Sequence, residues 1–567
     1  MSASPRRRAC RLLTAVAVCA GVLLPAATAS AEESAGTTVV GRLVQAYPEH
    51  ADPTQEHGPD VPLSWIRTAG GESVRVPTED LPDVPAGSTV SVDVGEPVHD
   101  AATGDGYKPA HEVLGSDVLR SAAVDDLQAT TAQLTNQVTV AMAVPAGGEE
   151  DAVTPTQVVD AVDGPVASFW SGQSGGAIRL GVTAVHDGWV HTKAGCGDPN
   201  AFWDEVAHDV GFVPGPGRHL VIYLSSRPAN LPGCSYALGQ VGSGPASGGS
   251  LYVRDTLPTV IAHELGHNFG LGHSSGLQCD ASLETGTCRT QGYRDYYDVM
   301  GASWSQVGAL TAAQADRLGL LPAAAQVDLL AGSPEGTYTL VPLAGATGTR
   351  AIRLSAPDGA VYWLEYRAAT GQDAWLGTPA NRFQLQTGVL LHRAGSLPDT
   401  SLLLDGTPAP AAGWDADLQD ALPTGAAIPL AGGAFTVTVT AVAPDAATVT
   451  VVAAQASAPA TVPATAPSTG GGVLPARTGA TTAGRPGSPA AVAPAAGTPQ
   501  QAAPTAAVGG DLAAAVEGGH QPRLAPASAV SARTSGPMLA AVAALAVGAV
   551  LLLWTVTSRL RRRSLRH

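Results

Sequence analysis

Residues 255–273 read Asp255-Thr-Leu-Pro-Thr-Val-Ile-Ala-His263-Glu264-Leu-Gly-His267-Asn-Phe-Gly270-Leu-Gly-His273, and they are the most informative part of the chain for its fold. Pro258 suits the first turn of a helix. His263 and His267 are four residues apart, so their imidazoles project from one face of that helix, about one turn apart. Gly270 can take the left-handed backbone conformation that ends a helix. The chain can then turn sharply and bring His273 back to the same point.

Three neutral imidazoles at one point predict a catalytic zinc site, because they leave the fourth position of Zn²⁺ to water. Zinc lowers the pKa of that water from about 15.7 towards about 7. Glu264 lies next to the histidine face, where it can reach the water without being a ligand. We expect Glu264 to accept a proton as the water attacks a carbonyl and then to deliver it to the leaving amine. The predicted cofactor is one Zn²⁺ per chain, bound by His263, His267 and His273.

The full pattern H-E-x-x-H-x-x-G-x-x-H resembles that of the metzincin metallopeptidases. Asp298-Val299-Met300-Gly301 is similar to the Met-turn of that family, whose methionine lies beneath the zinc histidines. Astacins and serralysins carry a tyrosine two residues after this methionine, where Ala302 stands here, so the chain is more similar to reprolysin-like and gametolysin-like peptidases. The resemblance covers roughly residues 135–322. It implies an α+β catalytic domain with α/β/α layers, in which Met300 and Gly270 support the site.

A second resemblance concerns substrate binding. Ser235-Tyr236-Ala237-Leu238-Gly239 is similar to the edge strand on which reprolysin-like enzymes bind substrate antiparallel. A substrate would then join the sheet as an additional strand. The resemblance implies that Tyr236, Ala237 and Leu238 contact an extended peptide.

Two hydrophobic segments predict the compartment. Residues 1–31 combine a basic start, an apolar run and the small residues Ala29-Ser30-Ala31, which is typical of a secretory signal peptide. Residues 537–557 are apolar over about the length that spans a bilayer, and five arginines follow. By the positive-inside tendency, the basic tail of residues 558–567 is cytoplasmic. We therefore expect a single transmembrane helix in the cell membrane, with the catalytic domain outside.

The charge of the chain argues against nucleic acid as a partner. Lys and Arg total 31, Asp and Glu total 48, and the formal net charge is −17 at pH 7. Nine of the arginines lie at the two ends, so the part between them is more acidic still. Such a surface repels phosphate backbones. The expected partners are extracellular proteins or peptides and, through the C-terminal helix, the membrane; the oligomeric state stays open.

Composition divides the remaining chain into a catalytic segment, two β-rich segments and a linker. Short alternating runs precede and follow the part in which strand and helix signals mix. Residues 455–536 are rich in Pro, Ala, Thr and Gly and have almost no large apolar side chains, so we expect a disordered stalk. The predicted order is an N-terminal β-rich module or pro-domain at 32–130, the zinc peptidase domain at 131–322, and a C-terminal β-sandwich at 323–454.

The cysteine count predicts disulfides. Two of the six cysteines leave with the signal peptide, and an even number remains in an exported chain. Three pairings are open. We favour Cys196–Cys234 and Cys279–Cys288, because the second pair closes a short loop between two functional motifs.

The N-terminal module occupies the place where such families keep a pro-segment. It contains no cysteine, so latency through a cysteine ligand is excluded. If the module inhibits, a side chain such as His111 or Glu112 would cap the zinc. A permanent β-domain is the alternative.

Other polar residues are predicted to have structural roles. His186, His191, His208 and His219 show no ligand spacing and predict hydrogen-bonded structural histidines. Tyr296 or Tyr297 could stabilise an oxyanion, although packing is the simpler role. Asp415, Asp417 and Asp420 form an acidic loop that could bind Ca²⁺, with solvated charge as the default.

The sequence thus predicts a membrane-anchored, extracellular zinc endopeptidase. One alternative is a surface adhesin with an idle peptidase-like domain, against which the intact Glu264 argues, because metal retention alone needs no carboxylate there. Zinc hydrolysis of a non-peptide amide and zinc storage are two further alternatives.

Overall fold

The computed structural model describes residues 36–51, 61–123, 134–302, 306–345 and 347–454. The predicted signal peptide, stalk, transmembrane helix and basic tail lie outside these residues. Within the described ranges, no helix is both long and apolar enough to cross a membrane.

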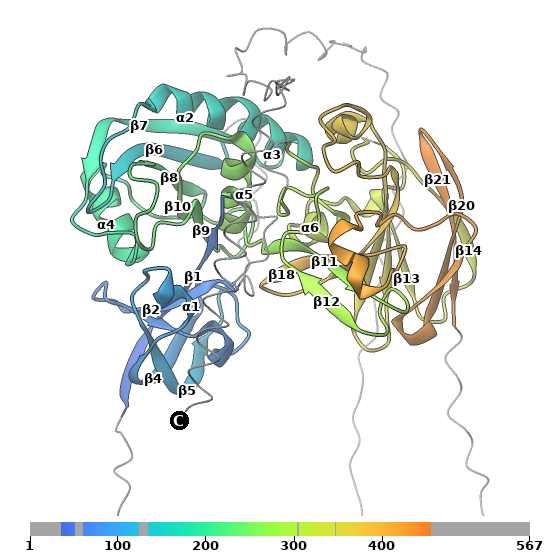
Figure 1. The fold of residues 1–567 in the computed structure, drawn as a ribbon, viewed down its shortest axis with the longest axis horizontal. Coiled ribbons are helices and arrows are strands. Elements are labelled where there is room, and N and C mark those ends of the chain that lie inside the picture. Colours follow the sequence, from blue (N-terminus) through green and yellow to red (C-terminus); the bar gives the residue numbers. More distant parts are fainter. Residues whose placement is uncertain (1–35, 52–60, 124–133, 303–305, 346, 455–567) are drawn as a thin grey trace, which may run out of the picture. The chain divides into compact units, whose positions relative to one another are not determined.

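A ten-stranded sheet contains the N-terminal strands as well as those of the central segment (Figure 1). Its main path runs β3-β2-β1-β9-β10-β8-β6-β7, and β4 and β5 extend it from β1. Strands β10, β8, β6 and β7 are parallel, whereas β9 runs antiparallel to both of its neighbours, β10 and β1. The strands are β1 (Thr37–Glu49), β2 (Leu63–Arg67), β3 (Ser73–Val76), β4 (Thr89–Val98), β5 (Ala110–Arg120), β6 (Asn136–Val144), β7 (Leu180–His191), β8 (Arg218–Leu224), β9 (Ala237–Gln240) and β10 (Gly249–Val253).

Helices cover both faces of the central strands. Along β8, Val221 and Tyr223 face one core, while Leu220 and Ile222 face the other, as the two-residue period of a strand requires. The first core contains residues of α2 (Pro155–Ala161), a π-helical segment (Val162–Val166), α3 (Ala167–Gln173) and α5 (Pro258–Asn268). The second core contains residues of α4 (Pro199–Asp209) together with residues of β1 and β2.

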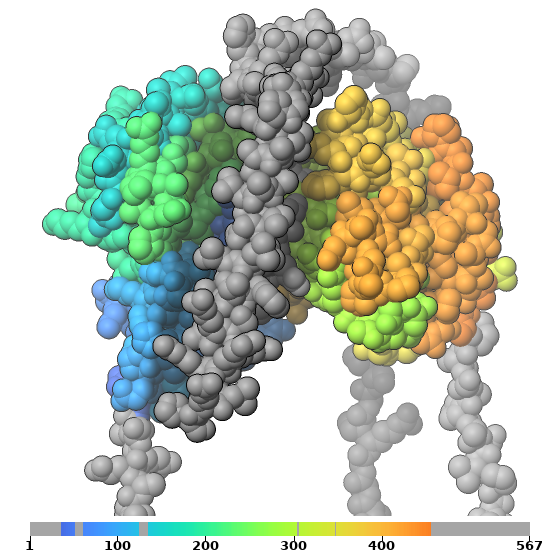
Figure 2. All heavy atoms as spheres, in the orientation of Figure 1, coloured from blue at the N-terminus to red at the C-terminus, as the bar shows by residue number. Residues whose placement is uncertain are grey.

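The N-terminal module is therefore continuous with the central segment. Strand β1 pairs with β9, and Val44 and Ala46 share a core with Phe202 of α4. In Figure 2 the blue surface of the module adjoins the cyan and green surface of the central segment. Neither the sheet nor the core ends at the predicted boundary near residue 130, because the long strand β1 of the module pairs with β9 of the central segment.

The boundary predicted at residue 322 also needs correction. A seven-stranded sheet, in the order β12-β11-β18-β17-β16-β15-β13, takes β11 and β12 from before that boundary. After α5 the chain leaves the first sheet, and β11 pairs in parallel with β18. The strands are β11 (His273–Cys279), β12 (Cys288–Gln291), β13 (Gln326–Leu330), β15 (Ala351–Ser355), β16 (Val361–Arg367), β17 (Gly388–Ala394) and β18 (Asp399–Leu404).

A four-stranded sheet, β14-β21-β20-β19, shares a core with the seven-stranded one, so the C-terminal part consists of two packed sheets. Its strands are β14 (Gly336–Leu340), β19 (Ala427–Leu430), β20 (Phe435–Ala443) and β21 (Ala446–Ala453). The two short helices outside the sheets are α1 (Ala101–Gly104) and α6 (Ala312–Arg317).

The two disulfides of the structure are Cys196–Cys234 and Cys279–Cys288, the pairs that the sequence favoured. Cys279 and Cys288 face each other across β11 and β12 and so hold this hairpin together.

Candidate metal centre

Helix α5 and the start of β11 bring the three predicted histidines together. His263 and His267 lie on α5, and His273 is the first residue of β11. All three side chains are fully buried. Gly270 has a φ of 93°, which allows the sharp turn between the helix and His273. The expected convergence is therefore present in the structure.

Backbone carbonyls fix the orientation of two of the rings. The Nδ1 of His263 donates to the carbonyl of Val299 at 2.8 Å, and the Nδ1 of His267 donates to that of Leu271 at 2.8 Å. Because a carbonyl can only accept, each Nδ1 carries the proton, and the Nε2 of each neutral ring presents a lone pair. Together with the Nε2 of His273, these atoms belong to a group of donors that could hold a metal ion.

Met300 packs beneath this part of α5. It is fully buried, and a Cβ atom added at Gly266 would collide with its Sδ. Asp298 holds the turn, because its two carboxylate oxygens accept from the backbone N–H groups of Met300 (2.7 Å) and Thr311 (2.5 Å). The sequence-predicted support residue thus lies in contact with the helix that carries the histidines.

The side chain of Glu264 is fully buried. Among the described residues, neither of its carboxylate oxygens has a hydrogen-bond partner. A Cβ atom at Gly239 would collide with Glu264 Oε2, so the glycine on β9 makes room for the carboxylate. Burial, and secondly the charge of Glu49, raise the pKa of Glu264 well above its usual value. Such an orphaned carboxylate indicates a functional position.

A fourth donor, Glu49, comes from the end of β1, a segment without a recognised motif. Its Oε1 lies 3.5 Å from the Nε2 of His263, 3.3 Å from that of His267 and 3.2 Å from that of His273. The side chain is fully buried. Burial would raise its pKa, but the charges of His263 and His273 lower it well below the usual value.

The two module residues that the sequence suggested as caps lie elsewhere. His111 Nδ1 bonds the carbonyl of Gly95 at 3.0 Å, and Glu112 is exposed on β5. The suggestion of His111 or Glu112 is therefore wrong. Strand β1 continues to Glu49 and so carries this carboxylate to the histidines.

Tyr293 is a further residue that sequence reasoning missed. Its hydroxyl donates to Glu49 Oε2 at 2.6 Å, and its ring centroid lies 4.0 Å from that of His273. Its φ of 58° is uncommon for a residue with a side chain. The candidates named from the sequence have other contacts, since Tyr296 stacks on Phe383 and the Tyr297 hydroxyl donates to the carbonyl of Gln386.

The predicted substrate edge is occupied by β1. Ala237 pairs with Glu49, and Leu238 pairs with Pro48. The backbone N–H of Tyr236 also donates to the carbonyl of Glu49, at 2.9 Å. Strand β9 is therefore paired on both sides.

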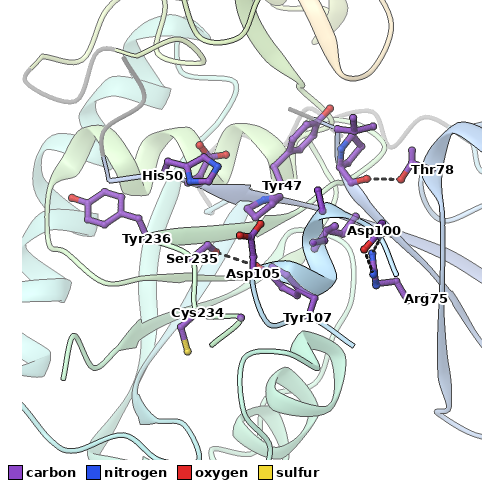
Figure 3. Close-up of a pocket in the computed structure, with 18 of the residues that line it drawn as sticks. Tyr47, His50, Arg75, Thr78, Asp100, Asp105, Tyr107, Cys234, Ser235 and Tyr236 are labelled. Carbon is purple, nitrogen blue, oxygen red and sulfur yellow. Dashed lines mark hydrogen bonds and ion pairs between the residues drawn. The ribbon is translucent and has the colours of Figure 1, made fainter. Parts of the chain in front are cut away.

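A cavity of about 1010 Å³ reaches Glu49 and His273. Figure 3 shows its walls, with Arg75 and Asp100 from the N-terminal module and Ser235 and Tyr236 from the segment before β9. The cavity thus lies beside Glu49 and His273, although both side chains are themselves fully buried.

The acidic loop offers less to a cation than its sequence suggested. Asp415 pairs with Arg289 at 2.5 Å, and Asp420 is buried. Within the described ranges, the group of side chains that could hold a metal ion consists of Glu49, His263, His267 and His273.

The donor chemistry of this group fits zinc. Imidazole nitrogens and a carboxylate oxygen are usual zinc ligands, and backbone carbonyls fix the orientation of two of the imidazoles. A bound cation would also offset the charge of the fully buried Glu49 carboxylate.

Comparison with models of protein families finds no match to this chain, and comparison with curated proteins finds none either. The geometry of the centre is therefore the basis for proposing a function.

Proposed function

We propose that this chain is an extracellular zinc endopeptidase, anchored in the membrane by its predicted C-terminal helix. One observation carries the proposal: three buried imidazoles meet at one point, and a buried carboxylate without hydrogen-bond partners, Glu264, lies on the same helix. The spacing and order of these residues resemble the metzincin pattern, which supports the same function.

The residues of the chain have distinct roles in this proposal. Zn²⁺, when bound, would supply Lewis-acid polarisation of the substrate carbonyl and acidify a water molecule. Glu264 accepts the proton of the water and later delivers it to the leaving amine. The Tyr293 hydroxyl donates a hydrogen bond to a substrate oxygen, as it does to Glu49 Oε2. The backbone of β9 aligns an extended peptide.

The test measures peptide cleavage and zinc content for the wild-type chain and for Glu49→Ala, each with and without Glu264→Gln. Because Glu49 occupies the centre, the Glu49→Ala chain is the more informative background. We expect Glu264→Gln to retain zinc and to slow cleavage roughly 10²–10⁴-fold. Cleavage at an unchanged rate by the Glu264→Gln chain would end the proposal.

A second candidate is a binding protein with a structural metal site. The observation in its favour is Glu49, because four protein donors form the closed arrangement of structural zinc. The orphaned Glu264 argues against it. If Glu49→Ala binds zinc and cleaves no member of a broad peptide library, this candidate replaces the peptidase.

A further inference from the structure

We infer that strand β1 closes the metal centre of the full chain, with Glu49 as the fourth donor and with the backbone of β1 on the edge that a peptide substrate would use. The closure follows from the geometry alone. Its consequence, that the full chain is latent until β1 is displaced, rests on the proposed function.

The distances around Glu49 are those of a coordination polyhedron. Tetrahedral zinc with bonds of about 2.0–2.1 Å separates its donor atoms by about 3.3–3.4 Å. Glu49 Oε1 lies 3.2–3.5 Å from each of the three Nε2 atoms, which is the separation expected of a fourth donor. The contacts to His267 and His273 are also within hydrogen-bond distance, so metal loading is the test of the donor role.

The ring orientations point the same way. The Nδ1 atoms of His263 and His267 donate to backbone carbonyls, so the Nε2 atoms of these rings face Glu49. A ring with its proton on Nδ1 can offer the Nε2 lone pair to a metal ion, and the carboxylate of Glu49 can join it as a further donor.

The backbone of β1 behaves as a bound peptide would. It runs antiparallel to β9, with Tyr47 opposite Gly239 and Glu49 opposite Ala237. The two-residue period of a strand places Tyr47 and Glu49 on the same face. There the Tyr47 ring stacks on His267, with centroids 4.4 Å apart and planes 17° from parallel.

The second oxygen of Glu49 completes the likeness to a substrate. Oε1 faces the histidines while Oε2 accepts from the Tyr293 hydroxyl at 2.6 Å. A carboxylate held in this way resembles the new C-terminal carboxylate of a cleaved peptide. Strand β1 therefore acts as an internal product-like inhibitor.

The experiment uses the full chain loaded with Co²⁺, whose visible absorption reports its ligands, and acetohydroxamate as a small probe of an open coordination position. Acetohydroxamate is small enough for the cavity that reaches Glu49 and His273. We expect it to leave the wild-type spectrum unchanged and to alter the spectra of Glu49→Ala and Glu49→Gln. We also expect Glu49→Ala to bind zinc at least 10–100-fold more weakly, the rough cost of losing even an outer-shell partner.

Two results would overturn the closure. One is a wild-type spectrum that responds to acetohydroxamate as strongly as that of Glu49→Ala, and the other is a lack of response in every Glu49 variant. The wild-type measurement decides even if a variant fails to fold. Glu112→Gln is the matched control, because Glu112 is exposed on β5 of the same module, and its spectrum should equal that of the wild type.

The outcomes separate closure from catalysis. A closed wild-type site together with peptide-inactive Glu49 variants supports closure and refutes the peptidase. An open wild-type site with peptide cleavage refutes closure and supports the peptidase.

Discussion

Two buried polar clusters each contact the segment 293–301, one through Tyr293 and the other through Asp295, and they stabilise their charges in opposite ways. The metal-centre cluster consists of Glu49, His263, Glu264, His267 and His273. The arginine cluster consists of Asp295, Glu365, Arg367, Asp373 and His392. Both are almost completely inaccessible to solvent, and both combine histidine with carboxylates.

The arginine cluster carries its own cations. Arg367 lies 2.7 Å from Glu365 and 3.1 Å from Asp373, and His392 lies 3.0 Å from Asp295. Burial opposes the charge of Arg367, but Glu365 and Asp373 raise its pKa above the usual value. Burial likewise opposes the charge of His392, yet Glu365 and Asp295 raise the pKa of that ring. Positive and negative charges thus compensate inside the protein.

The metal-centre cluster contains two carboxylates and no permanent cation. Its imidazoles are possible metal donors, and Glu264 has no hydrogen-bond partner among the described residues. The comparison teaches that similar side chains can serve structure or chemistry, depending on whether the cluster includes its own positive charge. Four predictions test it, from the largest expected effect to the smallest.

Removal of the internal cation should have the largest effect. We expect Arg367→Met to lower the free energy of unfolding by about 3–5 kcal/mol, because it removes the arginine partner of two buried carboxylates, Glu365 and Asp373. Urea denaturation measures the change. Arg382→Met is the control, since Arg382 is exposed and its loss should cost no more than about 0.5 kcal/mol. A loss below about 1 kcal/mol for Arg367→Met would show that this cluster does not depend on its arginine.

Removal of zinc, the cation that the metal-centre cluster would take from solution, should have the second-largest effect on stability. We expect zinc at 100 to 1,000 times its dissociation constant to raise the free energy of unfolding by about 2.7–4.1 kcal/mol over the chelated chain. Urea denaturation with and without a chelator gives the difference. The matched variant Glu49→Gln should show a smaller gain at the same zinc concentration. Equal stability of the wild-type chain with and without zinc would contradict the need for an external charge.

The hydroxyl of Tyr293 should contribute less. Tyr293→Phe removes the donor to Glu49 Oε2 but keeps the ring on His273. A hydrogen bond to a charged group contributes about 1.5–3 kcal/mol, so we expect a loss of that size in the zinc-bound chain. Thermal unfolding of the zinc-bound chain measures it, with Tyr296→Phe as the control. Equal melting temperatures for wild type and Tyr293→Phe would remove Tyr293 from the centre.

Asp420 shows a third way to tolerate a buried carboxylate, which is to keep it protonated. Burial, then the charges of Asp405 and Asp295, raise its pKa to about 8. The unfolded chain has a pKa near 4 at this position, so between pH 4 and pH 8 the folded state binds the extra proton and stability falls as the pH rises. The stability that the folded state keeps by holding this proton is fully present below about pH 4.

We expect Asp420→Asn to remove this pH dependence and to stabilise the chain by about 1–2 kcal/mol at pH 8. The upper limit is roughly 1.4 kcal/mol for each unit by which the pKa of Asp420 is raised, and we expect only part of it. Unfolding curves at pH 5 and pH 8 give the comparison. Asp445→Asn is the control, because Asp445 is exposed. A wild-type chain more stable at pH 8 than at pH 5, with the same difference in Asp420→Asn, would contradict a protonated Asp420.

Local signals predicted the histidine side of the centre. His263 and His267 are fixed by the period of one helix, and Gly270 allows the turn that returns His273. The disulfide Cys279–Cys288 also joins residues close in sequence. The domain boundaries at 130 and 322 were less predictable, because strand pairing between distant segments leaves no local pattern: β1 joins β9, and β11 joins β18.

The sequence by itself determined which side chains could bind a metal and activate water, because the spacing of one helix and one turn places them within a few residues of each other. Only the tertiary structure decided what faces them. Glu49 lies 224 positions from His273 and 244 from Tyr293, yet strand pairing brings all three to one buried point. Pairing over such distances depends on the whole sheet and its core, so no short segment of the sequence could predict it.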